Sequence, residues 1–527
     1  MKTSLFFGKP CCQAWYHISR WRVRSTDAPT QCESDLPGAR KRARHERWLL
    51  SKLIGTSLGG ILLLASVGTA APASAAYQRP NILFLCIDDL APQLGAYGAA
   101  QVKSPHMDRL AEAGLRFDRA YCQVPVCGAS RVSLMTGMLP TSERFTNYRS
   151  KADEDVPHAP TLPEVFRKAG YTTISNGKVF HSQSDTAERS WSEPPWRPEG
   201  WRSRTPAMES TMARLSERGR GLIYEIGEVP DSEYTDGRIA ARTIEDLQRL
   251  KDAGEPFMLF CGFYRPHLPF YAPKKYWDLY DRESIELADN RYFPRGAPHG
   301  DLRGSEEFWA YHHGDYDVGS DAFHRMMRHG YLASVSYVDQ LVGNVMAELE
   351  RLGLRQNTII VLWGDHGFHL GEHDFWGKHN TMHLSTRVPL ILSLPNKQLT
   401  STSALVESSD LFPTLCELAG VAIPDTVQGK SLVPLLKNPG QNFREAAYSR
   451  FGVERPGLAV ITERYNYTWY AKSGAEMLYD LEKDPGENRN VAGDPAYAEA
   501  LKEMRALLVK RRAEAGGPQQ GAPKEGK

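Results

Sequence analysis

The amino-acid sequence predicts an α/β fold. Helices flank a central, mostly parallel sheet, and a smaller antiparallel α+β subdomain follows at the C-terminal end. Continuous apolar runs, such as residues 81–87, lead directly into charged residues, as buried parallel strands do in α/β proteins. Segments with apolar residues at helical spacing separate these runs. In residues 458–481 the apolar runs give way to shorter segments in which apolar and polar residues alternate, a pattern typical of an antiparallel sheet.

Length and composition limit the function classes. The chain has 527 residues, which is more than one domain usually holds, and its 41% hydrophobic and 24% charged residues are typical of a globular enzyme. Lys and Arg total 64 against 63 Asp and Glu, a net charge of +1. This balance gives no indication of a nucleic-acid partner, so any anion-binding site must be local.

The N-terminal region has the features of a targeting segment. A basic run at 40–44 precedes the apolar stretch 53–70 and the small residues 73–75, which predicts a signal peptide cleaved before Ala76. The mature protein would then be exported, to the periplasm or as a secreted protein, or to a lysosomal or extracellular location in a eukaryote. An uncleaved membrane anchor is the alternative, because the apolar stretch is nearly long enough to span a bilayer.

Four regions follow from these boundaries. We expect a leader and signal peptide at 1–75, a catalytic domain at 76–395, a C-terminal subdomain packed on it at 396–515, and a disordered tail at 516–527, where Gly, Pro, Gln and Lys dominate.

The first predicted strand, 81–87, runs into Asp88 and Asp89. Open α/β sheets place their sites at the carboxyl ends of strands. Adjacent aspartates repel each other unless something positive holds them. The sequence therefore favours a divalent cation that prefers oxygen ligands, with a solvated turn as the alternative.

A helix at 107–114 precedes the segment 126–137, which contains Cys127 and Arg131. A cysteine near a cation in such a glycine-bounded segment suits a thiol nucleophile. It also suits a half-buried structural cysteine. The residues alone leave both interpretations open.

Two further predicted strands deliver polar residues. Residues 171–175 lead to Lys178 and His181, and residues 256–263 lead to His267, which lies between two prolines that fix its backbone.

Between these strands, the segment 189–205 carries Trp191, Trp196 and Trp201 and is predicted to be a loop. Its tryptophans suit stacking on sugar rings, or packing as an arm against the body of the protein.

The remaining predicted elements are a helix at 331–352, a strand at 358–363 that ends before Asp365 and His366, and a strand at 388–394. An irregular insertion at 283–325 precedes the helix. In the C-terminal part we expect a helix at 409–415, strands at 458–461, 467–470 and 477–481, and a final helix at 496–512.

Several of these segments resemble the type I sulfatases, formylglycine-dependent members of the alkaline phosphatase superfamily. The matching segments are 127–137 (Cys-Gly-Ala-Ser-Arg-Val-Ser-Leu-Met-Thr-Gly), 177–181 (Gly-Lys-Val-Phe-His), 265–269 (Arg-Pro-His-Leu-Pro) and 365–373 (Asp-His-Gly-Phe-His-Leu-Gly-Glu-His). They occur in the family's order and are closest to the iduronate-2-sulfatase branch. Ala129 stands where the family more often has proline.

The resemblance implies a function for each candidate site residue. Cys127 would be oxidised to Cα-formylglycine by a formylglycine-generating or an anaerobic sulfatase-maturating enzyme, and the hydrated aldehyde would attack sulfur. Asp88, Asp89, Asp365 and His366 would bind one Ca²⁺ together with residue 127. Lys178, His267 and Lys378 would hold the sulfate. Arg131 would orient residue 127, and His181 would accept the proton whose removal allows sulfate to leave.

The substrate implied by the resemblance is a sulfated carbohydrate, specifically the 2-O-sulfate of a terminal uronic acid. A cationic group for the sugar carboxylate is then expected from the loops 189–205 or 283–325. Other functions on the same fold are a sulfatase for another sulfated polysaccharide, a formylglycine-dependent phosphonate monoester or phosphodiester hydrolase, and a non-catalytic carbohydrate-binding homologue.

Overall fold

A computed structural model of the chain describes residues 79–199 and 220–517. The predicted signal peptide and leader, Trp201 and the tail beyond residue 517 lie outside the described residues. Within the described ranges, no helix is both long and apolar enough to cross a membrane.

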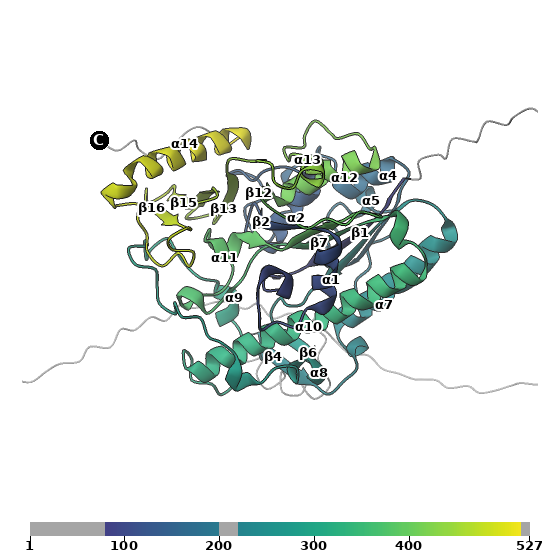
Figure 1. The fold of residues 1–527 in the computed structure, drawn as a ribbon, viewed down its shortest axis with the longest axis horizontal. Helices are drawn as coiled ribbons and strands as arrows, with labels where there is room; N and C mark the ends of the chain where they lie inside the picture. Colours follow the sequence, from purple (N-terminus) through teal and green to yellow (C-terminus); the bar gives the residue numbers. More distant parts are fainter. Residues whose placement is uncertain (1–78, 200–219, 518–527) are drawn as a thin grey trace, which may run out of the picture. The chain divides into compact units, whose positions relative to one another are not determined.

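In the part of the chain that the structure describes, eight strands form one sheet (Figure 1). From one edge they are β3 (Thr172–Gly177), β5 (Phe257–Phe263), β1 (Asn81–Ile87), β7 (Thr358–Gly364), β11 (Leu390–Ser393) and β2 (Leu115–Tyr121), with β10 (Arg387–Val388) and β12 (Ser401–Glu407) on β2. β10 pairs with β2 in antiparallel fashion, and β11 pairs with β2 and β7 in the same way. The other pairs in this sheet are parallel. The predicted mostly parallel sheet is confirmed.

Helices cover both faces of the sheet, because successive side chains of a buried strand point to opposite sides. In β1, Leu83 and Leu85 pack with α1 (Pro105–Ala113), α7 (Thr235–Ala253) and α10 (Asp321–Arg351). Phe84 and Cys86 pack on the other face with α2 (Cys127–Thr136), α4 (Leu162–Lys168), α12 (Leu411–Ala419) and α13 (Val433–Lys437). Figure 1 shows these two sets of helices on opposite sides of the sheet. Each fully buried large apolar side chain contributes about 1.5–3 kcal/mol.

The helix predicted at 331–352 begins ten residues earlier, since α10 spans Asp321–Arg351. The Ser320 side chain caps it by accepting a hydrogen bond from the Phe323 N–H at 3.1 Å. Phe323, Met326 and Met327 continue the apolar helical spacing into these first turns, where Arg and His residues lie between them, so the predicted start was too late. The irregular insertion is correspondingly shorter, and it contains the short helix α9 (Glu306–Trp309).

A separate antiparallel sheet forms near the C-terminus, as predicted. Its strands, in order, are β13 (Ala447–Phe451), β14 (Gly457–Ile461), β15 (Tyr465–Tyr470) and β16 (Glu476–Asp480). The helix α14 (Ala498–Glu514) packs its buried Leu501, Met504 and Leu508 on this sheet. β12 pairs with β2, and α12 packs on the large sheet, so residues after the expected boundary at 395/396 still belong to the large sheet and its helices. The small sheet begins only at Ala447.

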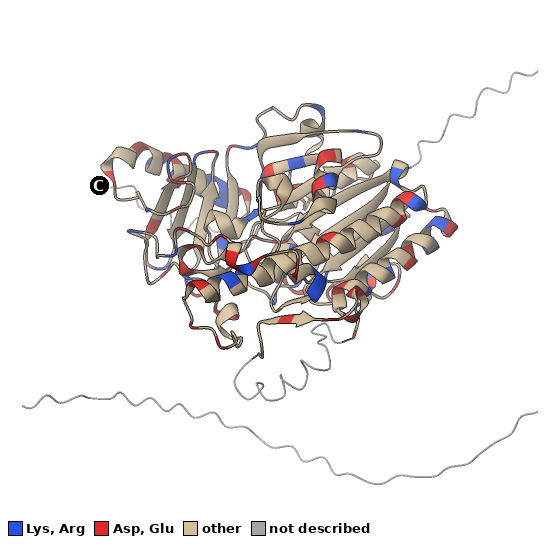
Figure 2. Ribbon diagram, turned by 60° about the horizontal axis from the view of Figure 1, so that its bottom comes forward, with Lys and Arg blue, Asp and Glu red and all other residues tan. Residues whose placement is uncertain are grey.

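Short elements complete the described fold. They are α3 (Ala152–Asp155), α5 (Ala187–Ser190), α8 (Lys274–Trp277), α11 (His383–Thr386), the paired strands β4 (Tyr224–Gly227) and β6 (Phe270–Pro273), and the paired strands β8 (His369–Leu370) and β9 (Trp376–Gly377). Figure 2 shows acidic and basic residues interspersed along the helices in that view.

A buried carboxylate joins the two sheets and the last helix. Glu407, at the end of β12, accepts hydrogen bonds on both carboxylate oxygens from one nitrogen, Arg511 Nη2, at 2.7 and 2.9 Å. Arg444 Nη1 lies 3.1 Å away, and the Tyr448 N–H of β13 donates to Glu407 at 2.7 Å. Burial would raise the pKa of Glu407, but the two guanidinium groups lower it.

We expect Glu407→Gln to lower the free energy of unfolding by about 3–5 kcal/mol, because it leaves two buried arginines without their shared charge partner. Denaturant unfolding followed by tryptophan fluorescence measures the change. The matched control is Glu482→Gln, which removes an exposed pair with Arg464 at 3.2 Å and should cost less than about 1 kcal/mol. Equal losses in the two variants would contradict this role for Glu407.

Candidate active site

The site lies where two neighbouring strands end. β1 and β7 are parallel and in register, with Ile87 opposite Gly364, so their carboxyl ends meet at one edge of the sheet. Asp88 and Asp89 follow β1, and Asp365 follows β7. Asp89 has φ 60°, a left-handed conformation that aspartate tolerates, and its N–H donates to Asp365 Oδ1 at 3.1 Å. The register of two strands thus brings three carboxylates together.

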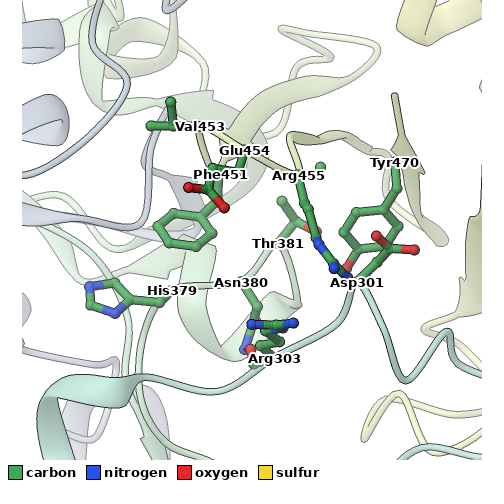
Figure 3. A pocket seen from close by; sticks show the side chains of 12 residues that line it. Asp301, Arg303, His379, Asn380, Thr381, Phe451, Val453, Glu454, Arg455 and Tyr470 are labelled. Carbon is green, nitrogen blue, oxygen red and sulfur yellow. The ribbon is translucent and has the colours of Figure 1, made fainter. Parts of the chain in front are cut away.

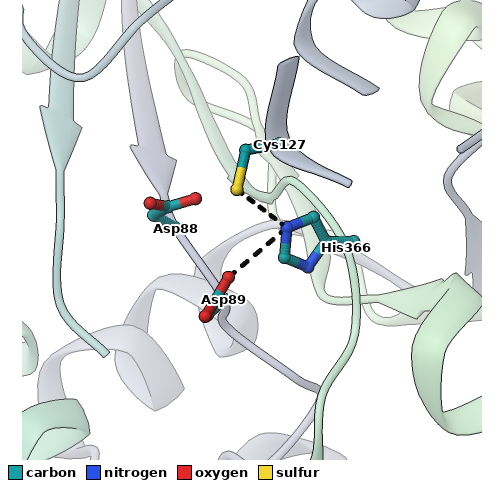
Figure 4. Close-up of side chains that lie close together, drawn as sticks. All are labelled: Asp88, Asp89, Cys127 and His366. Atoms are coloured by element: carbon teal, nitrogen blue, oxygen red, sulfur yellow. Dashed lines mark hydrogen bonds and ion pairs between the residues drawn. The ribbon is translucent and has the colours of Figure 1, made fainter. Parts of the chain in front are cut away.

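Four of the predicted metal ligands form one compact cluster (Figure 4). One ligand atom from each of Asp88, Asp89, Cys127 and His366 lies within 4.8 Å of all the others. His366 Nε2 is 3.3 Å from Cys127 Sγ and 3.4 Å from Asp89 Oδ1. Asp365 adjoins the cluster, with its Oδ1 3.6 Å from His366 Nε2.

The donor set of this cluster fits a divalent cation. The three aspartate side chains are completely buried close together, which is costly for carboxylates unless positive charge lies beside them. Burial raises the pKa of Asp89 to about 6 although Lys378 and His366 act to lower it. Burial would lower the pKa of His366, but Asp365, Cys127 and Asp89 together raise it to about 9. The shift of His366 reflects a concentration of negative charge that a bound cation with oxygen ligands would neutralise.

Cys127 is the first residue of α2, and its segment is held by buried contacts. The Cys127 side chain is buried and reaches the cluster from the helix N-terminus, where unpaired N–H groups and the helix dipole favour an anion. The next residue must be small, because a Cβ on Gly128 would lie 2.0 Å from the Tyr148 carbonyl oxygen.

Arg131 lies one turn further along α2 and ties the elements of the site together. Its guanidinium is completely buried, with Nε 2.9 Å from Asp365 Oδ2 and Nη2 3.3 Å from Asp88 Oδ1. Nη1 donates to the Val179 carbonyl at 3.0 Å and also to that of Lys178. Arg131 therefore links α2 to the ends of β1, β7 and β3.

Cationic residues surround the carboxylates on the cavity side. Lys178 Nζ pairs with Asp88, and Lys378 Nζ lies 2.8 and 3.0 Å from the two oxygens of Asp89. His267 Nδ1 is 2.7 Å from the Leu268 carbonyl, which only accepts, so Nδ1 donates and Nε2 is left for the cavity. This Nε2 lies 4.0 Å from Asp88 Oδ2.

His181 lies beside this group and is half-buried. Burial is the main cause that lowers the pKa of His181 to about 3, and the positive charge of Lys178 adds to the shift. The imidazole is therefore neutral near neutral pH and can accept a proton. Its ring packs edge-on against Tyr148 with centroids 5.8 Å apart. The structure thus brings all ten residues that the sequence singled out to one place.

A cavity of about 730 Å³ opens over this group, which is within the usual size of a small-molecule site. Besides Cys127 and the cationic residues, it is lined by polar and aromatic side chains that the sequence did not single out: Tyr148, Arg197, Arg220, Tyr264, Arg303, Glu306, Glu307, His379 and Phe451. Arg197 and Arg303 lie in the two loops, 189–205 and 283–325, from which a cationic group was expected, whereas Glu307 lies on α9 and Phe451 ends β13, where no motif marked them.

A smaller cavity of about 180 Å³ adjoins the first, and the two share Arg303, His379 and Phe451 (Figure 3). His379 and Phe451 stack with centroids 5.3 Å apart. The far side is formed by the small sheet, through Tyr470 and Arg455. Ring-stacking and charged groups thus continue from the first cavity toward the C-terminal sheet.

The predicted tryptophan loop packs against the body where it is described. Trp191 is 3% exposed and contacts Phe260 edge-on at 5.4 Å. Trp196 is half-buried, and its carbonyl accepts the Gly177 N–H at 2.8 Å. Arg197 donates to the carbonyls of Gly177 at 3.1 Å and His181 at 3.2 Å. For these residues the packing interpretation holds, and the arm supports the segment that carries Lys178.

Comparison with known proteins agrees with this geometry. Residues 80–421 match the Sulfatase family, and residues 371–514 match the C-terminal region of N-sulphoglucosamine sulphohydrolase. The chain is 30% identical over 529 residues to iduronate 2-sulfatase of Mus musculus, covering 83% of this chain and 95% of that protein.

Two solved structures share the fold. A protein in complex with its substrate D-glucosamine-2-N,6-O-disulfate has a TM-score of 0.68 at 24% identity, covering 85% of this chain and 100% of that one. Phosphonate monoester hydrolase of Agrobacterium radiobacter has a TM-score of 0.68 at 23% identity, covering 83% and 96%. Because the family match spans more than half of the chain, this protein belongs to the sulfatase family, as a type I sulfatase of the alkaline phosphatase superfamily and an enzyme that hydrolyses sulfate esters.

Proposed function

We propose that this enzyme removes the 2-O-sulfate of a terminal uronic acid from a sulfated saccharide, using a formylglycine at position 127 and a bound Ca²⁺. The observation that carries the proposal is the position of Cys127, which starts α2 at the base of a cavity and lies between three aspartates and two lysines. We also propose that the mature enzyme is exported, beginning at residue 76.

The proposed chemistry begins with binding of the sulfate group. Sulfate esters stay anionic at biological pH, so the site must offer positive charge that protons do not remove. Lys178, Lys378 and His267 Nε2 converge on the cavity beside Cys127 and would bind the sulfate oxygens. Such donors, fixed before the reaction, stabilise charge that develops on the leaving oxygen.

The modified residue and the metal would each supply one part of the reaction. Formylglycine at position 127 would supply a hydrated aldehyde as the nucleophile, replacing the thiol. A Ca²⁺ ion held by Asp88, Asp89, Asp365 and His366 would supply Lewis acidity toward a sulfate oxygen.

The chain's own residues then position and move protons. Arg131 holds Asp88 and Asp365 in place and keeps the start of α2 fixed against them. His181, neutral because of its lowered pKa, would accept the proton whose loss releases sulfate.

Two features support a uronate substrate. The mouse relative in the comparison is an iduronate 2-sulfatase, and the insertion contributes Arg303 to the cavity. Arg303 is exposed and has no hydrogen bond or ion pair from its guanidinium to any residue within 79–199 or 220–517. A free guanidinium in the same cavity as Cys127 suits the carboxylate of the sulfated sugar, which it can bind with two parallel hydrogen bonds.

We expect Arg303→Gln to lower kcat/KM for a 2-sulfated terminal uronate by about 10- to 100-fold, the value of a lost charge-assisted hydrogen bond. The kcat/KM for an aryl sulfate, which has no carboxylate, should change by less than about threefold. Equal losses on both substrates would show that Arg303 does not recognise the carboxylate.

A panel of sulfated saccharides tests the proposed substrate. The terminal 2-O-sulfated uronate should have the highest kcat/KM, and preference for an internal sulfate or a neutral sugar would leave a carbohydrate sulfatase of another specificity. A phosphonate monoester hydrolase shares the fold, so the panel should include a phosphonate monoester. Faster hydrolysis of the phosphonate than of every sulfate would favour that activity instead.

A further inference from the structure

Glu307 places a negative charge among the cationic residues of the cavity. It lies on α9, where the Ser305 side chain accepts its N–H at 3.3 Å. The adjacent Phe308 is completely buried and stacks on Trp376 with centroids 4.9 Å apart. These contacts fix the short helix, so the direction of the Glu307 side chain is set by the fold.

The Glu307 carboxylate contacts two cationic groups and an imidazole. Its Oε2 is 3.1 Å from Lys378 Nζ, and its Oε1 is 3.7 Å from His267 Nε2 and 3.1 Å from Arg220 Nη1. Burial would raise the pKa of Glu307, but Lys378 and His267 hold it well below the ordinary value, so the carboxylate is ionised. Two of its partners are the residues proposed to bind the sulfate oxygens.

The three aspartates of the site already have cationic partners. Asp88 pairs with Lys178 and Arg131, Asp89 pairs with Lys378, and Asp365 pairs with Arg131. Glu307 is therefore a further negative charge in the cavity that also holds Lys378 and His267. It reduces the net positive charge that an anion meets beside Lys378.

We propose that Glu307 determines the charge of the ester that the enzyme accepts, by admitting monoanionic sulfate esters and disfavouring dianionic phosphate monoesters. This inference rests on the proposed binding of the sulfate group by Lys178, His267 and Lys378. The two kinds of ester have nearly the same tetrahedral shape, so shape alone cannot separate them.

Charge can separate them. A phosphate monoester has a second pKa near 6 and is a dianion above neutral pH, whereas a sulfate monoester keeps a single negative charge. The dianion meets twice the repulsion from a fixed carboxylate. In a site of effective dielectric constant about 20, one further unit of charge a few ångström away changes affinity by about 10- to 100-fold. Without Glu307, the excess of positive charge would attract the dianion more strongly than the monoanion.

The test is Glu307→Gln, which keeps the shape of the side chain and its hydrogen-bonding oxygen but removes the charge. The measurement is the ratio of kcat/KM for para-nitrophenyl sulfate to that for para-nitrophenyl phosphate above neutral pH. We expect this ratio to fall by about 10- to 100-fold. An unchanged ratio, including equal losses on both esters, would overturn the proposal, because a residue that only positions Lys378 affects both esters alike.

A glutamate outside the cavity provides the control. Glu503 on α14 is exposed, has no ion pair with any residue that the structure describes, and does not line the cavity. Glu503→Gln makes the same chemical change away from the site, and we expect it to leave the ratio within about twofold. An equal change of the ratio in both variants would indicate a general effect of surface charge and would also overturn the proposal.

A binding measurement separates this inference from the proposed function. Inorganic sulfate is a dianion, so calorimetric titration should show it binding about tenfold or more tightly to Glu307→Gln than to the unaltered protein. Unaltered sulfate affinity would overturn the role of Glu307 even in an active enzyme. If the unaltered enzyme hydrolysed no sulfate ester, the proposed function would fail, and the titration would still decide the role of Glu307.

Discussion

Replacing Cys127 with alanine is expected to abolish turnover while leaving the fold intact. The side chain is small and sits in the first turn of a helix, so its loss opens little space. The proposed nucleophile is lost with it, and removal of a nucleophile from a group of residues that act as a unit lowers kcat on the order of 10⁴- to 10⁶-fold. Hydrolysis of an aryl sulfate and the unfolding midpoint measure the two effects.

The control for this substitution is Cys122→Ala. Cys122 is also completely buried, but its Sγ contacts the Ser385 carbonyl at 3.9 Å and does not line the cavity. We expect this variant to keep most of the activity. Mass spectrometry of the tryptic peptide that ends at Arg131 reads the modification directly, since the aldehyde is lighter than the thiol. Substantial activity in Cys127→Ala, or an active enzyme with an unmodified thiol, would refute the mechanism.

Asp365→Asn has the second largest expected effect. Asp365 accepts the Asp89 N–H and pairs with Arg131 at 2.9 Å, so the substitution removes charge from the metal cluster and from the residue that orients α2. Loss of metal-based stabilisation, worth several kcal/mol, corresponds to a fall in kcat of about 10²- to 10⁴-fold. The bound calcium per protein molecule should fall in parallel, and it can be measured by elemental analysis.

Asp118→Asn is the corresponding control. Asp118 lies on β2 of the same sheet and forms a partly exposed pair with Arg116 at 2.8 Å. Its replacement should change neither calcium content nor kcat by more than about twofold. A full complement of calcium together with normal kcat in Asp365→Asn would remove Asp365 from the site.

The parts of the site that the sequence predicted have a local origin. Asp88 and Asp365 follow strands that are apolar throughout, and such strands can be recognised without any knowledge of their neighbours. Two parallel strands of similar length then bring their carboxyl ends together. The motif around Cys127 and Arg131 added the third element. These residues could be predicted because position along the chain and position in the sheet are directly related.

The parts that the sequence did not predict depend on contacts between distant segments. Glu307 and Arg303 lie in an insertion without periodicity, and only the packing of Phe308 on Trp376 directs α9 toward the cavity. The strand β2 (Leu115–Tyr121) escaped detection because it carries Arg116, Asp118 and Arg119 within a central sheet. Its charged side chains are partly exposed, so the strand lacks the uniform apolar character of its neighbours.

The burial of Cys127 limits when the residue can be modified. The residue is 3% exposed, and the carbonyl of Tyr148 lies directly against the next position of the chain. A second enzyme that must enclose this segment can do so only before the helix has formed and packed. The proposed modification therefore belongs to the interval between synthesis and folding. The fraction of active molecules then depends on the rate of modification relative to the rate of folding, and a chain that folds before it is modified remains inactive.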